Sequence, residues 1–173
     1  MKLVWLVTIG LVFAVVAVAE ERAVDRAADR RLEFLNALRE RGYYDYALLY
    51  LEQLEGRQDL PEEMRQLLPL EKALILLEEV RTSTAAAEQH LQLDLARGEL
   101  ERFLKVHPDH ERAAQANSEL GQVFVQKGRV DVFQTRSPAN ARRKLKLRQS
   151  ARETFRQARA LFTRAESQQK AAL

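Results

Sequence analysis

The residues best suited to metal chemistry are His107 and His110, which are separated by Pro108 and Asp109. Imidazole and carboxylate groups are ligands that zinc accepts in proteins. Two ligands on one turn do not form a site without convergent partners, and Pro108 and Asp109 also suit the cap of a helix in an inter-helix turn. We therefore predict no metal or other cofactor. A metal-dependent hydrolase built around the two histidines is the alternative, which metal analysis of the purified protein would test.

Other catalytic patterns are missing from the sequence. The chain has no cysteine, which excludes disulfides and a thiol nucleophile. It has no glycine-rich phosphate loop and no serine in a G-x-S-x-G setting. Charged neighbours on helices, such as Glu71 and Lys72, are interpreted as solvated faces. The sequence therefore predicts a protein that is not an enzyme.

All four tyrosines gather within eight residues, directly after Gly42, at Tyr43, Tyr44, Tyr46 and Tyr50. Tyr44 and Tyr50 are interpreted as packing residues. Tyr43, Tyr46 and Tyr50 recur at intervals of three and four, so they share one face of a helix. We expect that face to pack on the preceding helix or to lie half exposed. A partner-binding aromatic face is the alternative.

The first twenty residues have the layout of a secretory signal. Lys2 is followed by an apolar run from Leu3 to Ala19, and the run ends in Ala17-Val18-Ala19, a small-x-small cleavage pattern. We predict a signal peptide over residues 1–19. An uncleaved membrane anchor is the alternative, since the run is at the short limit of the roughly 17–25 residues that span a bilayer. Both place residues 20–173 outside the cytoplasm, in the periplasm or cell envelope, with the anchored form held at the inner membrane.

Charge is distributed unevenly along a chain rich in Ala, Leu, Glu, Arg and Gln, the strong helix formers. Residues 1–135 carry 17 Lys/Arg and 23 Asp/Glu, whereas residues 136–173 carry 11 and 2. A basic tail is typical of contact with nucleic acid or anionic lipid, or of a helix beside an acidic body. The export signal argues against nucleic acid.

Apolar spacing after the signal is helical throughout and predicts an all-α protein of six helices. The expected ranges are 23–41, 44–55, about 61–80, 85–106, 111–127 and 138–168. Gly42 and Gly128 are interpreted as helix stops, and Pro69 as a kink or restart. Short connections predict that successive helices pack as three antiparallel hairpins.

The second helix of each expected pair carries a small residue, an apolar one four later and another three after that. The three sets are Ala47-Leu51-Leu54, Ala96-Leu100-Phe103 and Ala151-Phe155-Ala158. The pairing resembles the tetratricopeptide repeat, a 34-residue helix–turn–helix unit. LGQVFVQKGR, residues 120–129, is similar to the first helix of such a repeat, and FLKVHPDHERAAQA, residues 103–116, to a junction between repeats. Residues 40–54 are similar to a turn and second helix.

This resemblance implies one domain over residues 20–173, an array of about three hairpins stacked as a short right-handed solenoid. The chain departs from the family at Arg31, where an aromatic is usual, at the extra Pro69, and in an insertion after Gly128. It is also similar to exported bacterial proteins with such repeats, which are mostly known as interaction platforms. In the family the first helices line a groove. By resemblance the candidate peptide-binding residues are Asn36, Arg39, Glu40, Gln115, Ser118, Gln122 and Gln126.

That amide-rich lining suits an extended peptide or another protein, so we expect a non-catalytic interaction scaffold of the cell envelope. The alternative is a membrane-surface or envelope-assembly factor held by its N-terminal helix and its basic last helix. The candidate electrostatic patch is Arg142, Arg143, Lys144, Lys146, Arg148 and Arg152. These cations could instead pair with acids such as Glu119 or Asp131, or form a solvated face that solubilises the terminal repeat. Self-association through an exposed end is a further alternative.

Overall fold

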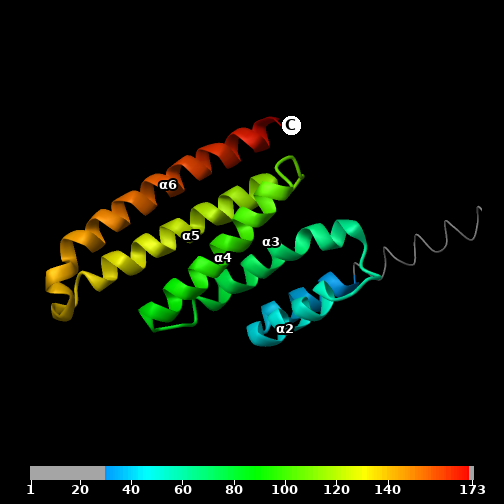
Figure 1. Cartoon of the computed structure of the whole chain (residues 1–173), viewed down its shortest axis with the longest axis horizontal. Helices are drawn as coiled ribbons and strands as arrows, with labels where there is room; N and C mark the ends of the chain where they lie inside the picture. The colour runs from blue at the N-terminus through cyan, green and yellow to red at the C-terminus, as the bar shows by residue number, and fades with distance from the viewer. Residues whose placement is uncertain (1–29, 172–173) are drawn as a thin grey trace, which may run out of the picture.

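The computed structural model of the chain describes residues 30–171, which are all-helical and contain no strand. The predicted all-α class is confirmed for these residues. Residues 30–40 form the described part of the first helix. The other elements are α2 (Tyr44–Glu55), α3 (Glu62–Glu79), α4 (Ala86–Val106), α5 (Ala113–Gln134), the 3-10 helix η1 (Pro138–Arg143) and α6 (Lys144–Ala171) (Figure 1).

The predicted signal peptide or anchor at residues 1–19 lies outside the described residues, as does the start of the predicted helix 23–41. Between residues 30 and 171, no helix has the length and apolar character needed to cross a bilayer.

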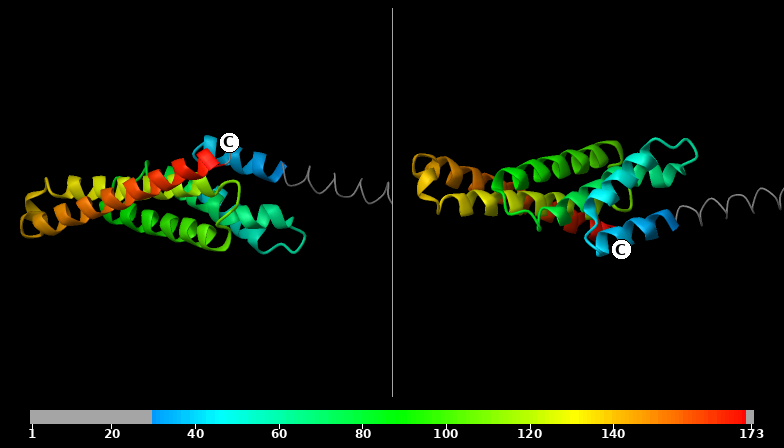
Figure 2. Two further views of the ribbon diagram at one scale, coloured as in Figure 1. Left: turned by 90° about the horizontal axis from the view of Figure 1, so that it is seen from above. Right: turned by 90° about the horizontal axis from the view of Figure 1, so that it is seen from below.

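Consecutive helices run antiparallel and pack side by side, as the views in Figures 1 and 2 show. The contacts join α2 to α3, α3 to α4, α4 to α5 and α5 to α6, and α3 also touches α5. The α5–α6 hairpin has the most extensive of these contacts, and its left end in Figure 1 projects past the other helices. The described residues therefore form a layered set of helical hairpins.

Gly42 ends the first helix as predicted. Its φ of 74° lies in the left-handed region, where a Cβ would be strained. The Gly42 amide donates to the Arg39 carbonyl at 2.9 Å, and the Tyr43 amide donates to the Leu38 carbonyl at 2.9 Å. This C-terminal cap reverses the chain into α2.

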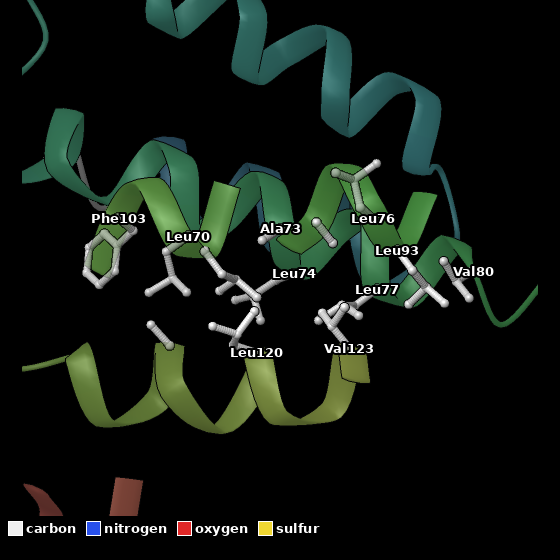
Figure 3. Packing of buried hydrophobic residues seen from close by; sticks show 13 residues of the cluster. Leu70, Ala73, Leu74, Leu76, Leu77, Val80, Leu93, Phe103, Leu120 and Val123 are labelled. Carbon is white, nitrogen blue, oxygen red and sulfur yellow. The ribbon is translucent and has the colours of Figure 1, made fainter. Parts of the chain in front are cut away.

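The core is built on both sides of α3. One cluster joins α3 to the first helix and α2, and consists of Leu35, Ala47, Leu51, Leu54, Leu60, Met64, Leu68 and Ile75. The other joins α3 to α4 and α5 (Figure 3), where Leu120 and Val123 of α5 point toward Leu74 and Leu77 of α3. Since α3 buries side chains on opposite faces, it is the centre of the fold.

Pro69 does not restart this helix, because α3 is continuous from Glu62 to Glu79. The proline removes one backbone hydrogen bond. It lies between Leu68 and Leu70, which are buried in the two different clusters. Apolar packing on both faces thus holds the helix together across the proline.

The prediction that a helix stops at Gly128 is wrong, since α5 continues to Gln134. A Cβ at Gly128 would lie 2.8 Å from the ring of Phe155, and one at Gly121 would lie 2.8 Å from the ring of Phe162. Both glycines are buried. They let α6 approach α5 closely instead of ending the helix.

The basic C-terminal helix also begins differently from the predicted range 138–168. Residues Pro138–Arg143 form a 3-10 turn, and the α-helix itself begins at Lys144. Its buried residues are Leu147, Ala151, Ala158 and Ala165. In the small-and-apolar pattern of the second helices, every member is buried except Phe155, which is 40% exposed and lies over Gly128.

Candidate binding face

Glu71 joins three helices through one buried carboxylate. Its Oε2 accepts a hydrogen bond from Arg39 Nη1 of the first helix at 3.1 Å, and its Oε1 accepts one from Arg112 Nη1 at 2.7 Å. Arg112 directly precedes α5. The Glu71 side chain is only 6% exposed. The first helix, α3 and the start of α5 are therefore tied together along one face, which we call the charged face (Arg39, Glu71, Glu78, Arg81, Arg112 and Glu119).

Arg39 is the most heavily bonded cation of this face. Its Nε and Nη2 donate to the two oxygens of Glu78 at 3.1 and 2.6 Å. This is a bidentate ion pair, whose hydrogen bonds are strong because both groups are charged. The pKa of Arg39 is raised. Burial is the largest single influence and lowers it, but the hydrogen bond and charge of Glu78, followed by the charges of Glu71 and Glu119, outweigh burial. Arg39 is thus a fixed cation.

Glu119 of α5 lies at the edge of the same network. Burial raises the pKa of its carboxyl, the positive charges of Arg81 and Arg39 lower it, and the negative charge of Glu78 adds to the rise. The net direction is upward. In the folded chain, Glu119 therefore holds its proton to a higher pH than an ordinary glutamate.

The Glu119→Gln variant is expected to unfold at a higher temperature than the native chain at neutral pH. A raised folded-state pKa means that protonation of Glu119 favours folding. That stabilisation is fully present below the unfolded-state pKa of about 4.3 and is lost as pH rises through the folded-state value. Glutamine mimics the protonated form at every pH, so the difference should vanish near pH ~4. Thermal unfolding followed by circular dichroism measures it, with the exposed Glu101→Gln as the matched control. An equal advantage at both pH values would contradict this account.

An open depression of about 440 Å³ lies beside the network. It is lined by Asn36, Arg39, Glu40, Tyr44, Glu78 and Arg81. The structure therefore brings together the three residues predicted on the first helix. Asn36 and Glu40 are exposed, and Asn36 Oδ1 accepts a hydrogen bond from Arg39 Nη1 at 3.3 Å.

None of the four residues predicted on α5 lines this depression. Gln115 accepts a hydrogen bond from Arg112 Nε at 2.9 Å and so belongs to the charged face. At about 100° per residue, Gln122 and Gln126 lie within about 20° of Gln115 around the helix, one and two turns past Glu119. Ser118 lies about 40° beyond Gln122, away from Arg112. The amides thus extend the charged face along α5, with Ser118 at its margin.

The interpretation of Glu71 as part of a solvated face is wrong, and the network it centres on was missed. Lys72 points to a different helix, where its Nζ lies 3.6 Å from Glu99 Oε1. A usable signal was present in the spacing: Glu71 and Glu78 are two turns apart on the half of α3 that carries most of its buried apolar residues. Such acids share one face and need cations nearby.

His107 and His110 belong to the core edge. Their ring centroids lie 5.7 and 5.3 Å from that of Phe103, and His110 Nδ1 accepts the Arg112 amide at 3.0 Å. No group of three or more metal-ligating side chains occurs within residues 30–171. The two rings therefore shape the turn before α5.

The tyrosines divide into two kinds. Tyr44 and Tyr50 are partly buried and pack on the first core cluster, which agrees with their interpretation as packing residues. Tyr43 and Tyr46 are more than half exposed. The Tyr50 ring packs edge-on against the Phe34 ring, with 4.9 Å between the ring centroids. An open cavity of about 400 Å³ lies over this outer face of the first hairpin.

The basic residues predicted as an electrostatic patch are all exposed and cluster at the start of α6. Pairing with Glu119 or Asp131 does not occur. Asp131 Oδ1 instead lies 3.3 Å from His90 Nε2, and the cations near Glu119 are Arg81 and Arg39. The patch is therefore not neutralised by those acids.

Comparisons with models of known protein families, with curated proteins and with solved structures find no match to this chain.

Proposed function

We propose that the protein is a non-catalytic scaffold of the tetratricopeptide type, which binds an extended peptide of another protein across the first helices of its three pairs. The observation that carries this proposal is the Arg39–Glu71–Arg112 bridge, which joins the first helix, α3 and the start of α5. In stacked hairpins of this type the first helices lie together and form an extended recognition surface.

The order of contacts supports the same arrangement. Each second helix touches the following first helix, as α2 touches α3 and α4 touches α5, and the first helices α3 and α5 also touch. Exposed Asn36 and Glu40, with Gln122 further along, offer amide and carboxylate groups to a peptide backbone. The proposed location is the cell envelope, on the strength of residues 1–19.

Site-specific photocrosslinking tests this proposal in cells that express the full chain. A benzophenone amino acid is placed at Asn36, at Gln122 or, as the matched control, at exposed Gln157 on α6. We expect adducts with the same protein from Asn36 and Gln122 and none from Gln157. Adducts that are equal at all three positions, or absent from both face positions, would overturn the proposal.

The partner found in this way allows a quantitative prediction. The triple variant Asn36→Ala, Gln122→Ala and Gln126→Ala is expected to weaken its binding by at least about tenfold, since each lost hydrogen bond costs about 0.5–1.5 kcal/mol. Binding of the purified chains, measured by calorimetry, checks this. Unchanged affinity in a folded triple variant would place the contact elsewhere.

A further inference from the structure

The projecting end of the α5–α6 hairpin, which we call the hairpin tip (residues 132–148), carries many positive charges and no negative charge. Six cations fall in it: Arg136, Arg142, Arg143, Lys144, Lys146 and Arg148. The sequence has no Asp or Glu from 132 to 152. All six residues are exposed. The tip therefore concentrates positive charge at one end of the molecule.

The described part of the chain leaves this charge without a counter-charge. None of the six side chains takes part in the ion pairs found among residues 30–171. The flanking acids are engaged elsewhere: Asp131 lies 3.3 Å from His90, and Glu153 lies 2.9 Å from Arg156. The cluster therefore suits an external anionic surface.

Large apolar side chains project beside these cations. Leu145 in the first turn of α6 is 74% exposed, and Phe133 in the last turn of α5 is 68% exposed. Within the described residues they are the two most exposed large hydrophobic side chains. A face that only solubilises the end of the array would be polar, so these two residues point to contact with a partly apolar medium.

The shape of the tip indicates whether it fits a broad surface or a peptide. The hairpin end projects beyond the neighbouring helices in Figures 1 and 2. A projecting end can lie against a broad surface, whereas a peptide is bound best in a groove that neighbouring helices enclose. Cations that meet phosphates while aromatic and aliphatic side chains enter the headgroup boundary are typical of membrane-surface binding. We propose that the hairpin tip docks on the surface of an anionic lipid bilayer, with Phe133 and Leu145 in the interfacial layer.

A fluorescent label tests this directly, because the chain has no native cysteine. A polarity-sensitive NBD label is attached to the full chain through Ser137→Cys at the tip or, as the matched control, through Ser167→Cys near the far end of α6. Twenty-three residues of helix separate Lys144 from Ser167, about 35 Å. Because the label reports only its own surroundings, it separates docking of the tip from attachment of any other segment.

The chain is reconstituted in phosphatidylcholine vesicles with or without about 30% phosphatidylglycerol. We expect blue-shifted emission and an intensity rise of about twofold or more at position 137 on the anionic vesicles, with little change at position 167. About 0.5 M salt should reverse much of the change. No response at 137, or an equal response at 167, would overturn the proposal. So would a response to soluble polyglutamate without one to vesicles, which would identify an acidic polymer as the ligand.

Two charge-reversal variants distinguish an effect of the charge at the tip from an effect of the net charge of the chain. Arg142→Glu with Arg143→Glu should weaken the response at 137 by about tenfold or more in lipid titration, since each cation contributes appreciably near an anionic surface. Arg159→Glu with Arg164→Glu changes the net charge equally on the body of α6 and should weaken it much less. Phe133→Ser with Leu145→Ser should lower the blue shift. Equal losses from the two charge variants would contradict docking at the tip.

Discussion

Replacing Glu71 with alanine is expected to lower the free energy of unfolding by about 3 kcal/mol, the lower end of the cost of breaking a buried ion pair. The substitution removes the carboxylate that Arg39 and Arg112 share at 3.1 and 2.7 Å. Their side chains are only 16% and 26% exposed, so water cannot fully replace it. Urea unfolding of the full chain, followed by helical circular dichroism, measures the loss.

Two companion variants identify the cause. Glu62 pairs with Arg65 at 3.7 Å on an exposed surface, so Glu62→Ala should cost less than about 0.5 kcal/mol. Glu71→Leu combined with Arg112→Met removes the acid and one orphaned cation together, while Arg39 keeps its fork to Glu78. This pair should be less damaging than Glu71→Ala alone. A Glu71→Ala chain as stable as Glu62→Ala would mean that the bridge does not hold the first helices together.

The elements that could be predicted from the sequence are those whose causes are local. Gly42 follows a helix of clear apolar period, and the left-handed turn it makes involves only neighbouring residues. The predicted 44–55 and 85–106 helices match α2 and α4 to within one residue. In each case, period and end signals lie within a few positions of the helix they define.

Gly128 shows where this local information ends. A glycine after an apolar stripe is a stop signal in one context and a close-packing site in another, and the sequence around it does not distinguish them. The ring that fills the space over Gly128 belongs to Phe155, on the following helix. Only the pairing of α5 with α6 shows why the helix runs on through the glycine.

The charged face was missed for the same reason. The nearest opposite charge to Glu71 in sequence is Lys72, but its bonded partners are 32 and 41 residues away. The resemblance to repeats did indicate which helix faces to examine, and Arg39 and Gln115 lie in the network. The resemblance could not indicate that glutamates of α3 complete it, because the pattern that carries the resemblance consists of small and apolar packing positions and specifies no charged ones.

Gly121→Ala is expected to destabilise the protein by about 1–2 kcal/mol, although alanine is the better helix former. The added Cβ would lie 2.8 and 2.9 Å from Cε1 and Cζ of Phe162, well inside normal contact. Overpacking of this kind costs about 1–3 kcal/mol, and contacts this short place the cost in the upper part of that range, at about 2–3 kcal/mol. It exceeds the gain of up to about 1 kcal/mol from helix propensity. Thermal and urea unfolding of the full chain measure the balance.

Gly98→Ala is the matched control, because Gly98 lies inside α4 with nothing within 4 Å of an added Cβ. It should stabilise the chain by about 0.8–1 kcal/mol through helix propensity alone. The close approach of α5 and α6 then accounts for a difference of about 2–3 kcal/mol between two identical substitutions. In a Phe162→Ala background the clash is removed, and Gly121→Ala should become stabilising, like Gly98→Ala. If Gly121→Ala already stabilises the native chain, the Phe162 ring moves aside at little cost, and the glycine is not what sets the separation of the two helices.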